Sequence, residues 1–189
     1  MPLNVLLLGP QGAGKGTQAK RISAEYGIPH IASGEILREE MDAGTDLGKR
    51  VKETIERGDL VSDDLMIELI RNRLEQTDTE AGFVLDGFPR TTVQAEALDS
   101  MFADIGRNFS VAFALQIPDE VAFDRLRRRA RADDTDEAIQ RRLDNYHRET
   151  EPLIEFYRTR GNVVPIHANR SENEVFAEIQ RALEQVPAA

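Results

Sequence analysis

Five short apolar runs recur along the chain and predict five β-strands. They lie at Asn4–Leu8, Ile28–Ile31, Phe83–Asp86, Val111–Ile117 and Val163–Ile166. Within each run the apolar residues are nearly continuous, which is typical of strands that are covered on both faces in a parallel sheet. The pattern therefore predicts a buried parallel sheet.

Amphipathic segments with a helical period lie between most of these runs. The predicted helices are Lys15–Tyr26, Asp119–Arg131, a long segment Asp136–Arg160 and Glu172–Gln185. Gly27, Gly58 and Gly161 stand where helix C-caps are expected, and Pro152 is expected to bend the longest helix. Alternating strands and helices predict an α/β fold, with a five-stranded parallel sheet flanked by helices on both faces.

Two stretches interrupt this alternation. Residues 32–61 insert two helical pieces, Gly34–Met41 and Leu47–Arg57, ahead of a helix over Asp63–Leu74. The second stretch, residues 128–134, joins two predicted helices with almost no additional chain. No internal repeat or interdomain linker is evident, so residues 1–189 are expected to form a single domain.

The composition limits the classes of protein that fit. The 189 residues are 40% hydrophobic and 31% charged, which suits one globular domain with a substantial core. No apolar run approaches membrane-spanning length, and the N-terminus lacks a signal-peptide pattern, so we expect no membrane association. The chain has no cysteine, which excludes disulfides and thiolate metal sites and fits a cytoplasmic location. A net charge of −10 argues against general nucleic-acid binding.

A glycine-rich loop follows the first predicted strand and opens the first predicted helix. Its anion-binding residues are expected to be Gly12, Ala13, Gly14, Lys15, Gly16 and Thr17. Glycines let successive backbone N–H groups turn toward a phosphate, and the helix behind them adds its free N–H donors. The strict phosphate-loop motif has a hydroxyl residue directly after the lysine, whereas here Gly16 takes that place and Thr17 follows.

Further motifs follow in order along the chain. They are Ser33-Gly34-Glu35-Ile36-Leu37-Arg38, Asp59-Leu60-Val61, Asp86-Gly87-Phe88-Pro89-Arg90-Thr91 and Arg129-Ala130-Arg131-Ala132-Asp133-Asp134. Together with the phosphate loop, this set resembles the adenylate kinase family over nearly the whole chain. The resemblance implies a P-loop NTPase fold with a small insert at residues 32–61 that binds the nucleoside monophosphate. It also implies a short lid at residues 128–134 without the zinc that longer lids sometimes hold.

The resemblance implies two nucleotide sites and a catalytic set. The ATP site would comprise the phosphate loop, Arg129 and Arg170. The AMP site would comprise Ser33, Arg38, Asp59, Leu60, Val61, Gly87, Phe88, Pro89, Arg90, Gln94, Arg131 and Arg142. The catalytic residues would be Lys15, Arg90, Arg129, Arg131 and Arg142, and Asp86 would orient Mg²⁺ through water. For Asp86, a helix cap or a salt bridge is the alternative interpretation.

These residue types suit phosphoryl transfer, which depends mainly on alignment and charge stabilisation. Seven arginines lie within eighteen residues, at 125, 127, 128, 129, 131, 141 and 142. For Arg125, Arg127, Arg128 and Arg141 the expectation is a solvated helix face, with Asp133, Asp134, Asp136 and Glu137 as weakly coupled partners. The three histidines are expected to be packing or surface residues.

Two residues favour AMP as the acceptor. Gln94 offers both a donor and an acceptor to the adenine edge, whereas the related pyrimidine monophosphate kinases resemble one another in having asparagine there and alanine in place of Ser33. The leading hypothesis is a monomeric, magnesium-dependent adenylate kinase that converts ATP and AMP reversibly into two ADP. A UMP/CMP kinase and a non-catalytic nucleotide sensor are the alternatives. Arg170 replaces a glycine that relatives often have beside the donor base, which leaves donor preference open.

Overall fold

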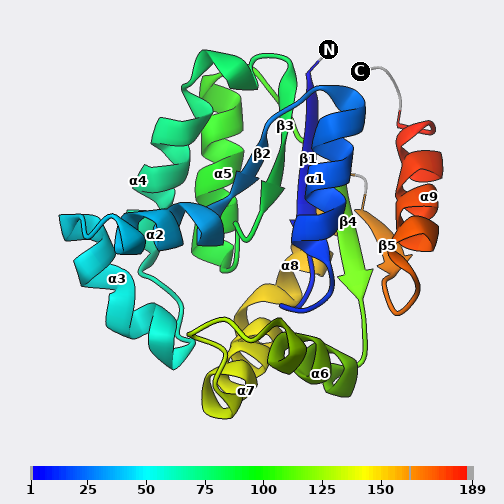
Figure 1. Ribbon diagram of the computed structural model, residues 1–189. Helices are drawn as coiled ribbons and strands as arrows, with labels where there is room; N and C mark the ends of the chain where they lie inside the picture. The colour runs from blue at the N-terminus through cyan, green and yellow to red at the C-terminus, as the bar shows by residue number, and fades with distance from the viewer. Residues whose placement is uncertain (1, 162, 187–189) are drawn as a thin grey trace.

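Five parallel strands form the centre of the computed structural model, which describes residues 2–161 and 163–186 (Figure 1). They pair in the order β2-β3-β1-β4-β5. Their bounds are β1 Leu3–Leu8, β2 His30–Ala32, β3 Gly82–Asp86, β4 Val111–Gln116 and β5 Val163–His167. The predicted five-stranded parallel sheet is confirmed. Strand β2 begins two residues later than predicted, because Pro29 has no N–H to donate to a neighbouring strand.

Alternate residues along the strands pack into two separate hydrophobic cores, one on each face of the sheet. In β1, Leu6 and Leu8 pack on the side covered by α4 (Asp63–Leu74), α5 (Thr92–Asp104) and α8 (Pro152–Arg158). Val5 and Leu7 face the opposite side, which α1 (Lys15–Tyr26) and α9 (Glu172–Leu183) cover. Burial on both faces explains why these strands read as continuous apolar runs.

Helix α5 is an element that the sequence analysis did not predict. Its buried apolar residues are Ala95, Leu98, Met101 and Phe102, which recur at helical spacing and pack into the first core. The side chain of Thr91 caps its first turn by accepting from the Gln94 N–H. The signal for a helix was therefore present directly after the Phe88-Pro89-Arg90 motif.

The long predicted helix Asp136–Arg160 is divided into three parts. They are α7 (Asp136–Asn145), a π-helical turn (Tyr146–Thr150) and α8, which begins at Pro152. Pro152 was expected to bend this helix, and the structure shows that the regular α-helix is interrupted before it and begins again at Pro152.

Two of the three predicted glycine caps are confirmed. Gly27 ends α1 and Gly58 ends α3 (Asp46–Arg57), both in the left-handed conformation. The prediction for Gly161 is wrong, because α8 ends earlier, with Thr159 as its C-cap in right-handed geometry. Similarly, α6 (Asp119–Arg129) ends two residues before the predicted Arg131, where the backbone turns into the left-handed region.

The two stretches that interrupt the strand–helix alternation both lie toward the carboxyl ends of the strands (Figure 1). Helices α2 (Ser33–Asp42) and α3 form a tightly packed hairpin after β2. Residues 130–135 connect α6 to α7, and the end of α3 rests on α7. In the part of the chain that the structure describes, every helix is too short or too polar to cross a bilayer.

His147 is one of the histidines expected to be packing or surface residues, and it ties two elements together. Its Nδ1 lies 2.8 Å from Glu151 Oε2, and its Nε2 lies 2.9 Å from Asp119 Oδ2 at the start of α6. The hydrogen bond with Glu151 raises the pKa of His147, and Asp119 adds to the effect against the opposing effect of burial. The imidazolium therefore links α6 to the segment before α8.

We predict that this link stabilises the fold at acidic pH. Because the folded-state pKa is raised above 6.5, the stabilisation is complete below that pH and is lost as pH rises through the folded-state pKa. The His147 side chain is 44% exposed, so the effect should be on the order of 0.2–1 kcal/mol. Thermal unfolding of wild type and His147→Gln from pH 5 to pH 9 should show a difference that shrinks with rising pH. A difference independent of pH would contradict the prediction.

Candidate active site

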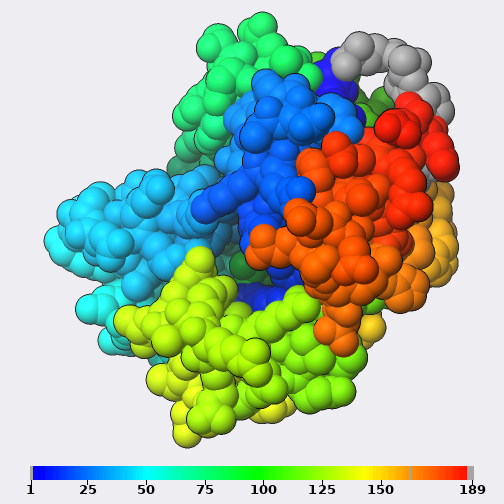
Figure 2. Space-filling model, turned by 45° about the vertical axis from the view of Figure 1, so that its right-hand side comes forward, coloured from blue at the N-terminus to red at the C-terminus, as the bar shows by residue number. Residues whose placement is uncertain are grey.

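A cleft of about 770 Å³ opens at the carboxyl ends of the strands. Figure 2 shows it hollowed between the α2–α3 hairpin, the segment around α6 and α7, and the chain that follows β5. The loop after β1 forms its floor. Ligands of open α/β sheets bind at this edge, because the connections after neighbouring strands meet there.

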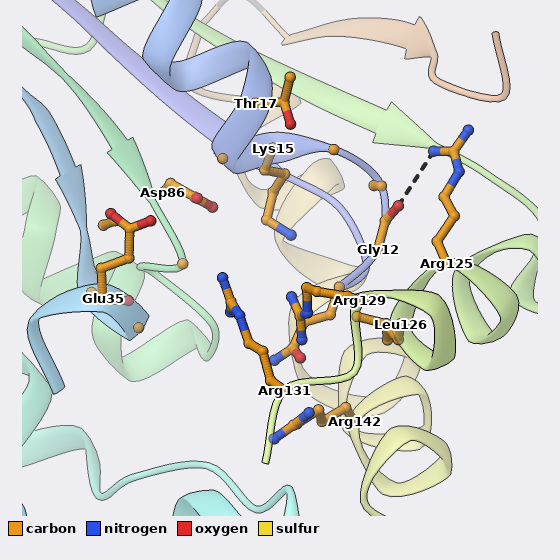
Figure 3. Close-up of a pocket in the computed structure, with 18 of the residues that line it drawn as sticks. Gly12, Lys15, Thr17, Glu35, Asp86, Arg125, Leu126, Arg129, Arg131 and Arg142 are labelled. Carbon is orange, nitrogen blue, oxygen red and sulfur yellow. Dashed lines mark hydrogen bonds between the residues drawn. The ribbon is translucent and has the colours of Figure 1, made fainter. Parts of the chain in front are cut away.

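The glycine-rich loop places Lys15 at the centre of the cleft (Figure 3). Gly12 has φ +86°, and a Cβ there would come within 2.8 Å of the Ala122 carbonyl oxygen, so the loop requires glycine where it passes α6. The Lys15 ammonium donates to Gly9 O at 2.8 Å and Pro10 O at 2.9 Å. Burial lowers the pKa of Lys15 to about 8.

Asp86 ends β3 and lies across a small gap from the loop. Burial alone would raise its pKa, but nearby His30, Lys15 and Arg90 outweigh burial and hold the pKa below its usual value. His30 Nε2 is 3.7 Å from Asp86 Oδ2, too far for a hydrogen bond. Asp86 therefore presents an ionised carboxylate toward the cleft.

The surroundings of Asp86 fit a hydrated magnesium ion. A Cβ added at Gly16 would lie 3.6 Å from Asp86 Oδ2, in van der Waals contact, so the carboxylate lies directly beside the glycine-rich loop. Mg²⁺ keeps several waters when it binds beside phosphates, and such an ion needs only one nearby carboxylate. Among residues 2–161 and 163–186, no group of three or more Asp, Glu or His residues is arranged to hold a metal ion directly.

Arg90 is fixed at three points on the side of the cleft nearest β3. Its Nε donates to Gly87 O at 2.7 Å, its backbone N–H donates to Gln94 Oε1 at 2.8 Å, and its carbonyl accepts from Thr150 Oγ1 at 2.9 Å. Burial lowers the pKa of Arg90. These contacts leave the terminal nitrogens of the guanidinium for an anion.

Gln94 is buried and serves the fold as well as the cleft. Its Nε2 donates to Asp63 Oδ1 at 2.9 Å, and the same carboxylate accepts from Thr91 Oγ1. With Oε1 bound to the Arg90 N–H, one lone pair and one N–H of the amide remain for a ligand. The buried hydroxyl of Ser33, also at the cleft, has no hydrogen-bond partner within the described residues.

Three further arginines meet around one buried acid, Asp134. Arg129 binds it through two nitrogens at 2.9 and 2.7 Å, Arg142 donates to it at 2.6 Å, and the Arg131 N–H at 3.2 Å. Arg142 also pairs with Asp133. Burial alone would raise the pKa of Asp134, but Arg129 and its neighbours outweigh it and keep the pKa low.

The sequence analysis misjudged Asp134. It expected a weakly coupled surface acid, whereas the side chain is 0% exposed and orients two of the predicted catalytic arginines. Figure 3 shows Arg129 and Arg131 extending toward Lys15, with Arg142 below them. Hydrogen bonds from a guanidinium group to a fixed carboxylate restrict its orientation and favour a single productive arrangement.

Arg125 is a second residue that the sequence analysis misjudged. It was expected on a solvated helix face, but it donates to Gly12 O at 3.3 Å and to Ala168 O at 3.2 Å and lines the cleft (Figure 3). The signal was its spacing of four residues from Arg129, which puts both on one face of α6. The expectation of a surface ion pair does hold for Arg127, which pairs with Asp136.

Arg170 also lines the cleft, two residues after the Ala168 carbonyl that accepts from Arg125. Its Nε donates to His167 O at 3.0 Å, and its guanidinium pairs with Glu178. Ala130 is the non-glycine residue with positive φ among the described residues, so Arg170 itself does not adopt that conformation. The turn that sequence reasoning left open therefore accommodates arginine without backbone strain.

Nearly all the predicted site residues line this one cleft. Phe88 is an exception, because it is 1% exposed and packs in the first core. Pro89 borders a small adjoining cavity together with Arg90 and Thr150. The cleft also includes residues that the sequence analysis did not single out, among them Gln18, Ile55, Glu172 and Val175.

Comparisons with known proteins agree with this geometry. The family model described as adenylate kinase matches residues 7–162. Three similar proteins, each named adenylate kinase, come from Cyanothece sp., Phocaeicola vulgatus and Methanosarcina barkeri. The Cyanothece protein is 44% identical over 96% of this chain and 95% of its own length. The Phocaeicola vulgatus protein is 42% identical over 97% of this chain and 100% of its own length. The Methanosarcina barkeri protein is 38% identical over 97% of this chain and 99% of its own length. The chain belongs to the adenylate kinase family.

Proposed function

We propose that this protein catalyses reversible, magnesium-dependent transfer of a phosphoryl group from ATP to AMP, giving two molecules of ADP. The adenylate kinase relatives and the family model support this reaction. We further propose a monomeric enzyme of the cytoplasm, in keeping with a chain that has no cysteine.

The observation that carries the proposal is a concentration of cations in one cleft of an acidic protein. Among the described residues, nine cationic side chains line it, namely Lys15, Lys20, Arg38, Arg90, Arg125, Arg129, Arg131, Arg142 and Arg170. The chain as a whole has a net charge of −10. Two polyphosphate substrates that repel each other require such a local reversal of charge.

The donor would bind along the phosphate loop, with its base toward Arg125 and Arg170. In this arrangement Lys15 exchanges its contacts with Gly9 O and Pro10 O for donor phosphate oxygens. An anion beside Lys15 also raises its pKa again, which secures the ammonium form. Mg²⁺, when bound, neutralises charge on the donor phosphates, and Asp86 would hold its water shell.

The acceptor would bind between the 32–61 insert and the loop after β3. Arg38 and Arg90 would hold its phosphate, while Gln94 and Ser33 would read the adenine edge. Arg129, Arg131 and Arg142 would cover the transferring group from the α6–α7 connection. We propose that residues 128–134 act as a short lid that needs no zinc.

The remaining alternatives differ in what the site must contain. A nucleotide sensor does not require cations around a transferring phosphoryl group, whereas here Asp134 orders Arg129 and Arg142 for that position. A pyrimidine monophosphate kinase would be expected to have asparagine in place of Gln94 and alanine in place of Ser33, whereas this chain keeps the longer amide and the hydroxyl at the cleft. The first observation favours phosphoryl transfer over binding alone, and the second favours AMP as the acceptor.

A coupled assay of ADP formation tests the function directly. We expect turnover with ATP and AMP that is far faster than with CMP, UMP or GMP as the acceptor, and we expect none after Mg²⁺ is removed with EDTA. Restoring Mg²⁺ should restore the rate. Comparable rates with CMP or UMP would indicate a pyrimidine kinase, and binding of ATP and AMP without turnover would indicate a sensor.

Arg90→Lys should lower turnover at least about a hundredfold, the scale expected for slight misplacement of a reacting group. Lysine keeps the charge but loses both the Nε bond to Gly87 O and the two-pronged grip on phosphate. Steady-state kinetics with AMP provide the measurement. Arg127→Lys is the matched control, because Arg127 is an exposed partner of Asp136 away from the cleft. Near-normal kinetics for Arg90→Lys would show that Arg90 is only structural.

Gln94→Asn should weaken recognition of adenine. The shorter side chain also loosens its bond to the Arg90 N–H, which affects all acceptors alike, so the informative quantity is a ratio. We expect kcat/KM for AMP relative to CMP to fall about tenfold to a hundredfold, as for loss of a bidentate base contact. Gln140→Asn, on the exposed face of α7, should leave the ratio unchanged. An unchanged ratio in Gln94→Asn would mean that adenine is recognised by other groups.

A further inference from the structure

The turn between α7 and α8 is wider than an α-helix. The Glu151 N–H donates to Tyr146 O at 2.8 Å, which is the five-residue spacing of a π-helix. Pro152 explains its position, because proline has no N–H and its ring would clash with the carbonyl of residue 148 in a continuous α-helix. Single π-turns of this kind are frequent at functional sites.

The two ends of the turn each donate one hydrogen bond toward the acceptor side of the cleft. Asn145 Nδ2 donates to Gly58 O at 3.2 Å, and Thr150 Oγ1 donates to Arg90 O at 2.9 Å. Both residues are buried, at 6% and 8% exposure. In an α-helix, two residues five positions apart, such as Asn145 and Thr150, have side chains about 140° apart around the helix axis. The wider π-helical turn reduces that angle.

Gly58 precedes the segment Asp59–Val61, which lines the cleft. Gly58 has φ +79°, and a Cβ there would come within 2.5 Å of Ala138 O, so α7 packs directly against its backbone. Arg142 adds a bond to Ile55 O at 3.2 Å, and Arg141 pairs with Asp59 at 3.3 Å. The end of the insert is thus held on the helix that carries Arg142.

We propose that Asn145 and Thr150 are positioning residues that set the distance between the two halves of the AMP site. Asn145 acts through Gly58 on the segment 59–61, and Thr150 acts through the Arg90 carbonyl on the guanidinium. Neither side chain belongs to the lining of the 770 Å³ cleft, so each works without touching the nucleotide. This inference rests on the proposed roles of Arg90 and residues 59–61 in holding AMP.

The test uses substitutions that keep side-chain shape. Thr150→Val removes the hydroxyl, and Asn145→Asp removes the amide donor and places an oxygen against Gly58 O. Each should raise KM for AMP about threefold to tenfold, the range of a single hydrogen bond, with KM for ATP changed less than twofold. Thr150→Ser, which retains the hydroxyl, should restore the wild-type KM for AMP.

Thr159→Val is the matched control. Thr159 also donates its hydroxyl to a backbone carbonyl, Phe156 O at 2.9 Å, but on the exposed end of α8. It should affect thermal stability without changing KM for either substrate. A purely structural role for Thr150 would likewise lower the melting temperature and leave the ratio of the two KM values unchanged.

Two outcomes would overturn the proposal. One is a KM for AMP within twofold of wild type in both Thr150→Val and Asn145→Asp, and the other is an equal rise in KM for AMP and ATP. If one variant does not fold, the other decides the result. Failure of the proposed function is separable, because the wild type would then not form ADP selectively from ATP and AMP, whereas failure of the positioning proposal alone leaves wild-type turnover intact and Arg90→Lys impaired.

Discussion

Holding several like charges close together is the constraint on which this structure depends. Arg129, Arg131 and Arg142 lie near Lys15 and Arg90, and without compensation their repulsion would push these side chains apart into solvent. The buried carboxylate of Asp134 accepts from two of the guanidinium groups and from a backbone N–H. It stabilises the cluster in the absence of substrate and fixes the direction in which the arginines point.

Compensation by an internal acid also limits how strongly the cleft attracts anions. Asp133 and Asp134 offset part of the charge of the three arginines, so the empty cleft is less positive than its arginine count suggests. Lys15 shows the same balance, because burial lowers its pKa to about 8 while Asp86 opposes that effect. Each of these cations would attract a phosphate most strongly once phosphate oxygens replace the protein groups that it now contacts. If the nucleotides bind as we propose, this arrangement would favour the state in which both are bound, which is the state that must react.

Much of the fold could be predicted because its signals are local. Apolar runs gave the five strands, and the order of motifs placed the loop, Arg90 and Arg129 at one edge of a parallel sheet. Two of the errors concern side-chain contacts that exist only in the folded chain. Arg125 reads as a solvated cation until Ala168, forty-three residues away, accepts from it. Asp134 reads as a surface acid until α6 and α7 bring two arginines onto it. Helix boundaries differed for a related reason, since only the folded chain shows where a residue such as Ala130 turns left-handed.

Gln94 shows why base recognition and phosphate binding cannot be separated completely in this site. One amide connects Asp63 at the start of α4, the backbone of Arg90 and the space left for the acceptor base. A ligand that reorients the amide would therefore shift the loop that carries Arg90, the arginine that we propose binds the acceptor phosphate. Thr150 holds the same loop from the opposite side. In the proposed AMP site, the position of Arg90 would thus depend on the base as well as on the phosphate, so a poorly fitting base would reduce alignment of the reacting groups in addition to losing its own contacts.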